Sequence, residues 1–241
     1  TITSHVFVLG EAALPAGTVV SFERAAALPD DSPVRCVDAD IERQMIAGID
    51  RAKEAGDTMG GAFKGIVKGL PVGLGRYTQW DRKLDGRLAQ ALMSIPAIKA
   101  VGIGLGPEVA VRPGSRVHDE IVPDTSGLHA TGLARPTNNA GGLEGGVTNG
   151  EDLRVSAWMK PISTLMKPLR SVDLTTMQES PAAIERSDVC AVPAASVVGE
   201  AMVALVLADA LVERFGGDAI ADLERAVAAS TEAVRARFRA R

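Results

Sequence analysis

Three short segments combine polar and glycine residues in a way that packing alone does not explain. The first, residues 138–150, begins with Asn138 and Asn139 and is rich in glycine, including Gly145. Glycine lets a backbone approach a ligand closely and leaves amide N–H groups free to donate hydrogen bonds. Taken alone, the same composition also fits a flexible loop.

The second segment runs Lys160-Pro161-Ile162-Ser163-Thr164 and directly follows an alternating stretch that predicts a strand. It places an ammonium group and two hydroxyl groups around a turn that proline fixes. These groups could bind a phosphate or a flavin, although neither ligand follows from this segment by itself.

The third segment, residues 185–193, lies directly ahead of a long apolar stretch and contains Arg186 and Asp188. An arginine here could bind a phosphate or a carboxylate through a forked pair of hydrogen bonds. A partly buried Asp188 beside it could relay a proton. Alternatively, Arg186 and Asp188 form an ion pair, with Asp188 stabilised by the positive end of the following helix. The spacing leaves both interpretations open.

Other motifs disfavour several functions. Residues 102–106 repeat glycine after a predicted strand, but the third glycine has the wrong spacing for a dinucleotide-binding loop, and Pro107 follows where a helix should begin. We interpret them as a turn. No Gly-x-x-x-x-Gly-Lys-Ser/Thr motif occurs, which disfavours a nucleoside triphosphatase. His5, His118 and His129 lack metal-ligand spacing, so we expect no metal site.

The composition indicates a folded protein with a sizeable core. The chain has 241 residues, of which 46% are hydrophobic and 23% charged. This fits one large domain or two closely packed ones, and we expect a single domain over residues 1–241. A net charge of −4 argues against a nucleic-acid partner. Cys36 and Cys190 have neither metal-ligand nor disulfide spacing, and no leader opens the sequence, so we expect a reduced, cytoplasmic protein.

The longest apolar stretch, residues 192–212, approaches the length of a membrane span. Glu200 and Asp209 interrupt it and would be costly in a bilayer. We therefore expect no membrane partner and a buried core helix from Pro193 to about Phe215, ended by a Gly-Gly pair.

The remaining periodicity predicts a mixed α and β chain. Alternating and β-branched stretches predict strands, and apolar residues three or four apart predict helices. The predicted strands cover residues 1–8, 60–70, 97–104 and 153–159, and the other predicted helices cover residues 38–55, 80–94 and 218 onward into the basic tail. In the helix over residues 80–94, Leu84, Leu88, Leu92 and Met93 should face inward.

Together and in this order, the three polar segments resemble the signatures of chorismate synthases. The likeness extends to Gly73-Leu74-Gly75 ahead of Trp80-Asp81, and to residues 93–99 and 202–208, so it covers essentially the whole chain. It implies the family's α+β fold, layered β-sheets sandwiched by α-helices, and a homotetramer. Members carry a substantial further segment before the strand that opens this sequence, so the chain is identified as the C-terminal part of a chorismate synthase.

The resemblance implies a phosphate lyase of the shikimate pathway. The family converts 5-enolpyruvylshikimate 3-phosphate to chorismate by a 1,4-elimination of phosphate and requires reduced FMN, without net redox change. The departing phosphate calls for arginines, and the flavin can lend electron density and recover it. The resemblance also implies NADP as the nicotinamide that supplies electrons to the flavin, whether this protein or another reductase carries out that reduction.

The resemblance also assigns site residues. Positions that line FMN in the family match Pro96, Ala97, Gly145, Lys160, Pro161, Ile162, Ser163, Thr164 and Arg186. Arg186 also matches a position close to the anionic substrate, and Asp188 matches the aspartate proposed to assist proton transfer at the flavin, which makes Asp188 the expected catalytic residue. The family's two acid histidines and most of its substrate-binding arginines belong to the N-terminal segment, so this chain alone is expected to be inactive or nearly so.

Local departures and two alternatives complete the expectation. Ala100 and Gly102 belong to the stretch Lys-Ala-Val-Gly-Ile-Gly, where relatives usually have Lys-Gly-Val-Glu-Ile-Gly. This difference affects the shape of the loop on the flavin side. One alternative is a truncated, non-catalytic chain that retains a flavin- or phosphate-binding core. The other is an unrelated phosphate-binding module.

Overall fold

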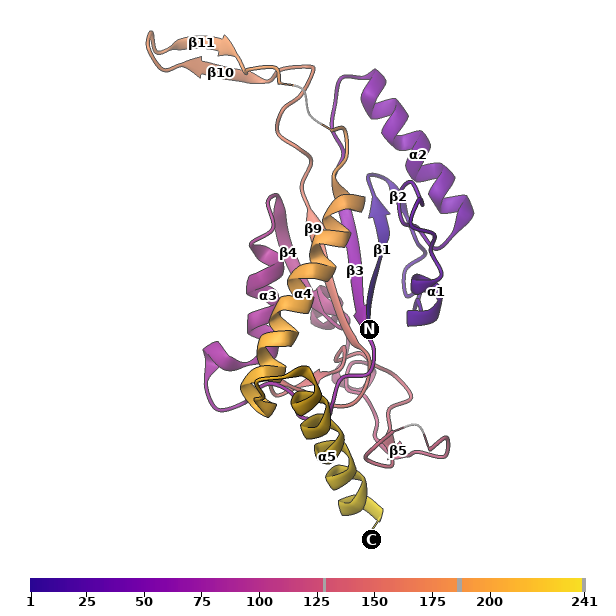
Figure 1. Cartoon of the computed structure of the whole chain (residues 1–241). Helices are drawn as coiled ribbons and strands as arrows, with labels where there is room; N and C mark the ends of the chain where they lie inside the picture. Colours follow the sequence, from indigo (N-terminus) through magenta and orange to yellow (C-terminus); the bar gives the residue numbers. More distant parts are fainter. Residues whose placement is uncertain (128, 186–187, 240–241) are drawn as a thin grey trace.

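A five-stranded antiparallel sheet forms the centre of the computed structural model (Figure 1). The structure describes residues 1–127, 129–185 and 188–239. The sheet has the order β2-β1-β3-β9-β4, with bounds Ala12–Ala13, Ile2–Leu9, Gly61–Val67, Leu153–Met159 and Ile98–Ile103. Its four longer strands coincide with the four predicted ones, and together with the helices they confirm the α+β fold.

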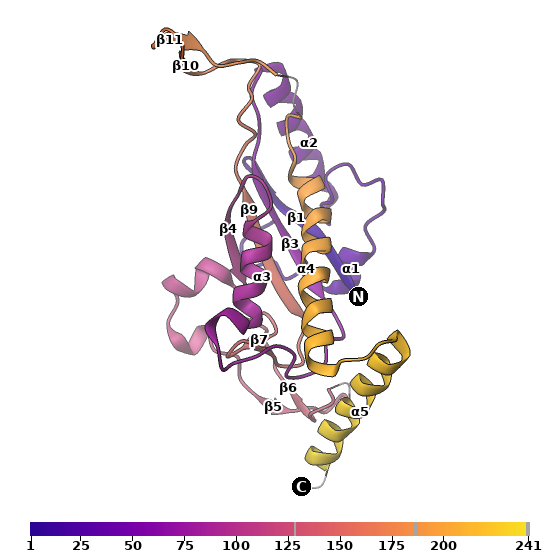
Figure 2. The same ribbon diagram turned by 60° about the vertical axis from the view of Figure 1, so that its left-hand side comes forward.

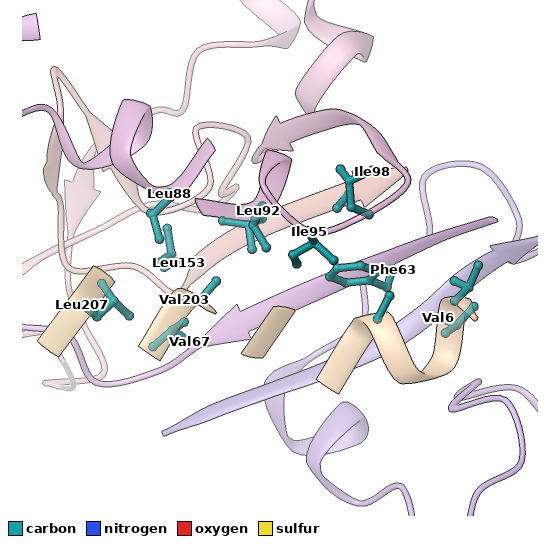
Figure 3. Packing of buried hydrophobic residues seen from close by; sticks show 14 of the residues in the cluster. Val6, Phe63, Val67, Leu88, Leu92, Ile95, Ile98, Leu153, Val203 and Leu207 are labelled. Atoms are coloured by element: carbon teal, nitrogen blue, oxygen red, sulfur yellow. The ribbon is translucent and has the colours of Figure 1, made fainter. Parts of the chain in front are cut away.

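One face of this sheet carries the hydrophobic core. Side chains alternate along a strand, so directly paired residues share a face. Val6 pairs with Phe63, and Phe63 pairs with Ala157 on the other side. All three are buried, and Figure 3 shows the Phe63 ring beside Ile95, with Leu92 next to Ile95 in the same core. Each large apolar side chain buried in this way contributes about 1.5–3 kcal/mol to folding.

Helices α3 (Leu84–Met93) and α4 (Val192–Phe215) cover this core face and lie next to each other (Figure 2). Leu88 and Leu92 are completely buried, as predicted. The prediction for Met93 was wrong, because its side chain is 46% exposed. A residue directly after Leu92 points about 100° further around the helix, which turns it away from the sheet.

The prediction that α4 is a buried core helix holds for one side of the helix. Val203 and Leu207 are buried against the sheet, whereas Leu205 on the opposite side is 65% exposed. The length and apolar composition of α4 would also suit a membrane span, but core helices of soluble proteins share both properties. Its Glu200 is paired with Arg35, with 2.8 Å between Oε1 and the guanidinium nitrogen. The outer side of α4, where Leu205 lies, is an apolar surface.

Three further helices complete the described α-helices, α1 and α2 beside the sheet and α5 beyond its end (Figure 1). Helix α2 (Ala39–Glu54) begins where predicted, because the Asp38 carboxylate accepts hydrogen bonds from two amides of its first turn. Helix α5 (Ile220–Arg239) follows α4 and runs into the basic tail, as predicted. Helix α1 (Phe22–Ala26) was not predicted, since five residues are too few to show a helical period.

Several short strands outside the central sheet were not predicted. Strands β10 (Arg170–Asp173) and β11 (Gln178–Pro181) form an exposed hairpin that projects well away from the sheet (Figure 1). Between β4 and β9 the chain forms 3₁₀ turns and four two-residue strands. These are β5 (Val122–Pro123), β6 (Leu133–Ala134), β7 (Leu143–Glu144) and β8 (Val147–Thr148).

Candidate active site

One end of the central sheet brings together two of the segments singled out in the sequence. β4 begins and β9 ends at this end of the sheet, since Ile98 pairs with Met159. Just beyond that pair, the Lys160 amide donates a hydrogen bond to the Ala97 carbonyl at 2.9 Å. The Pro96-Ala97 turn therefore lies directly beside the segment that begins at Lys160.

The Ala97 backbone is strained. Its φ of 68° lies in the left-handed region, which is unfavourable for a residue with a Cβ. Such conformations persist when the surrounding structure enforces them, and they concentrate at functional sites. Here the hydrogen bond from Lys160 and the strand that starts at Ile98 hold the turn on both sides.

The third segment reaches the same end of the molecule through β3. The Met59 amide, next to the start of β3, donates to the Val189 carbonyl at 2.8 Å. This bond places Asp188, the neighbour of Val189, close to the beginning of α4 with its side chain exposed. Arg186 lies outside the described residues. Burial raises the pKa of the nearby Cys190 thiol, so this thiol stays protonated at neutral pH.

The charge at this end is suited to an anion. Lys160 is exposed, Lys99 lies on the adjacent strand, and Lys167 follows a few residues later. None of the three pairs with a carboxylate within the part of the chain that the structure describes. Ser163, three residues after Lys160, is also exposed, and ammonium and hydroxyl groups of this kind could bind a phosphate. Asp188 is accessible to accept a proton.

Gly145 does not join this cluster. It forms the turn between β7 and β8 with a φ of 64°, and its neighbour Gly146 accepts a hydrogen bond from the Leu84 amide at 3.0 Å. This contact is near the Leu153 end of β9, whereas Lys160 follows the other end. Seven residues of strand separate the two ends, which corresponds to roughly 20 Å.

Comparison with known proteins identifies the family. The family model for chorismate synthase matches residues 1–212. The chain belongs to the chorismate synthase family. The chorismate synthase of Geobacter sulfurreducens is 55% identical over 220 residues, which are 90% of this chain and 56% of that protein. That of a Nocardioides species is 53% identical over 224 residues, 93% of this chain and 56% of the relative.

A solved structure shares the fold. A crystal structure of chorismate synthase matches with a TM-score of 0.80 and 38% sequence identity, over 98% of this chain and 64% of that chain. The chain spans about half the length of the curated chorismate synthases it matches, 56% in the first example. The family match includes the segments around Lys160 and Asp188, and it ends within α4.

Sequence reasoning missed the segment between α2 and β3. The Thr58 hydroxyl donates to the Ile162 carbonyl at 2.6 Å, and Met59 makes the bond to Val189 described above. The available signal was weak: Gly56 ends a predicted helix, and two glycines open the following strand. These contacts join residues more than a hundred positions apart, so no local pattern could reveal them.

Two other features are separate from this site. Gly104, with a φ of 59°, belongs to the turn predicted over residues 102–106, and a 3₁₀ helix rather than an α-helix follows it. A cavity of about 230 Å³ lies between α5 and the loop around His129. The His129 ring lies 3.2 Å from an Asp124 oxygen and 3.5 Å from a Glu151 oxygen, so two carboxylates flank it.

Proposed function

We propose that this chain carries part of the active site of a chorismate synthase, a lyase that eliminates phosphate from 5-enolpyruvylshikimate 3-phosphate with reduced FMN. The observation that carries the proposal is the contact between Ala97 and Lys160 at the same sheet end as Asp188. Residues from three family motifs, separated by up to about 90 positions, thereby meet at one place. The alternative of an unrelated phosphate-binding module does not account for this arrangement or for the family match.

The residues present fit an FMN molecule in its charge requirements. FMN carries a phosphate, and Lys160, Lys99 and Ser163 offer two ammonium groups and a hydroxyl, with neither lysine ion-paired to a carboxylate among the described residues. The held turn at Pro96-Ala97 gives a rigid edge next to them. When bound, the reduced flavin would supply electron density to the substrate as its phosphate leaves.

The protein groups then have distinct roles. The lysines would bind anionic groups and stabilise the developing charge of the phosphate. The Asp188 carboxylate, exposed ahead of α4, would accept and return a proton at its side-chain oxygens. Arg186, which precedes it in the sequence, would bind the flavin and the anionic substrate. Pro161, Ile162 and Thr164 would line the flavin through the segment that Lys160 begins.

The complete reaction should need more than this chain. The relatives contain a large portion that this chain does not span, and the resemblance assigns to it two acid histidines and most of the substrate-binding arginines. The chain alone should therefore have little or no activity. We also propose a single domain, a cytoplasmic location, assembly as a homotetramer and a dependence on NADP for flavin reduction. The exposed apolar side of α4 supports burial against further protein.

The decisive test is anaerobic turnover of 5-enolpyruvylshikimate 3-phosphate with chemically reduced FMN, followed by the appearance of chorismate. The chain should be tested alone and together with the remaining portion of a relative. Activity in the second mixture, lost on Asp188→Asn, supports the proposal. FMN affinity should fall in Lys160→Met but not in the control Lys68→Met, whose lysine lies at the opposite end of β3. Unchanged FMN affinity in Lys160→Met would refute the site.

A further inference from the structure

The segment from Gly56 to Gly60, which we name the α2–β3 linker, contacts both halves of the candidate site. Its Thr58 hydroxyl donates to the Ile162 carbonyl at 2.6 Å, in the middle of the segment proposed to line FMN. Its Met59 amide donates to the Val189 carbonyl at 2.8 Å, directly beside Asp188. One short stretch thus connects the proposed flavin segment to the proposed proton acceptor.

The same linker also holds the chain just beyond residues 160–164, the flavin segment. The Lys167 amide donates to the Gly56 carbonyl at 3.0 Å. With the bond from Thr58 to Ile162, this gives two attachment points five residues apart, and the hydroxyls of Ser163 and Thr164 lie between them. The backbone between two such points has few alternative conformations, so its hydroxyls are held in place before any ligand binds.

The linker packs closely against the start of the segment proposed to line FMN. A Cβ on Gly60 would lie 2.5 Å from the Met159 carbonyl oxygen and 2.9 Å from Cδ of Pro161. The linker backbone therefore lies directly against the proline that turns the flavin segment away from β9. A side chain larger than hydrogen at position 60 would therefore collide with Met159 and Pro161.

We propose that Thr58 is a positioning residue of the active site. Its hydroxyl holds the backbone at Ile162 and thereby sets the position of Ser163 and Thr164 relative to Asp188. Nothing in the geometry requires Thr58 to touch the flavin itself. This inference rests on the proposed function, because the segment that Thr58 holds matters for catalysis only if it lines FMN.

Three variants test the hydroxyl. Thr58→Val keeps the branched shape and removes the donor, while Thr58→Ser keeps the donor. Thr18→Val is the matched control, because the Thr18 hydroxyl also donates to a backbone carbonyl at 2.6 Å, that of Pro15, on an exposed turn. The Kd for FMN is measured by quenching of flavin fluorescence on the whole chain. It should rise about tenfold in Thr58→Val and stay near the wild-type value in Thr58→Ser and Thr18→Val.

A second measurement does not depend on flavin. Amide hydrogen exchange over residues 163–167, without ligand, should become about tenfold faster in Thr58→Val and remain unchanged in Thr58→Ser. Unchanged exchange in Thr58→Val overturns the inference, and so does faster exchange with an unchanged Kd for FMN. Failure of the wild-type chain to bind FMN, together with no turnover in the mixture with the remaining portion of a relative, would refute the proposed function instead, and faster exchange in Thr58→Val would still establish that its hydroxyl holds this segment.

Discussion

Lowering the pH from 7 to 4 should destabilise the chain through one residue, His5 of β1. Its side chain is 1% exposed, and its Nε2 atom is buried without a hydrogen-bond partner in the described structure. Burial, aided by the positive charges of Lys64, Arg154 and Arg24, lowers the pKa of His5 from 6.5 to about 4. The neighbouring Val6 carbonyl opposes this shift but does not cancel it.

The size of the effect follows from this shift in pKa. Between pH 6.5 and pH 4 the unfolded chain binds a proton at His5 and the folded chain does not, so acidification favours unfolding. The contribution of His5 is fully present above pH 6.5 and is lost as the pH falls to about 4. At 1.36 kcal/mol for each pKa unit, a shift of this size corresponds to about 3 kcal/mol.

The assay is urea unfolding of the wild-type chain and of His5→Gln at pH 7 and pH 4. Carboxylates titrate in the same range, so the informative quantity is the difference between the two proteins in their loss of stability. The wild-type protein should lose about 3 kcal/mol more than His5→Gln. His118→Gln, at an exposed histidine, should behave like the wild type. Equal losses in the wild type and His5→Gln would refute the argument that burial keeps His5 neutral.

Four further substitutions test the packing and the site. Gly199→Ala should lower the free energy of unfolding, measured by urea titration, by about 1 kcal/mol. The new Cβ would lie 2.6 Å from the Phe63 ring, and this crowding outweighs the gain in helix propensity. A more stable variant would contradict this reasoning. Ala97→Gly should raise the free energy of unfolding by about 0.5 kcal/mol, since glycine tolerates the φ of 68°, and a lower melting temperature would argue against strain. Glu200→Gln should cost about 2 kcal/mol, because the Arg35 guanidinium is only 17% exposed and loses its carboxylate. Combining it with Arg35→Met should cost less than the sum of the two single changes, and strict additivity would show that the pair does not interact.

Local sequence patterns predicted the four longer strands of the central sheet and every α-helix of the described chain except the short α1. The Asp38 cap and the apolar spacing through Met45 define α2, because both depend on residues within a few positions of each other. Strands β1 and β9, which pair with β3 on the two sides of Phe63, were predicted for the same reason. The hairpin β10–β11 was missed because its residues are exposed and polar, so that no apolar alternation marks it.

The sequence by itself determined the family and the residues that carry its motifs, because motif identity is a property of short stretches. It also determined that Val192–Phe215 is a helix. Only the tertiary structure decided which of these stretches meet: Ala97 with Lys160, and Thr58 with Ile162, while Gly145 lies at the other end of the sheet. The tertiary structure also decided that α4 buries one side only. The physical reason is that such contacts depend on strand order, register and helix orientation, which bring together residues that no local interaction connects.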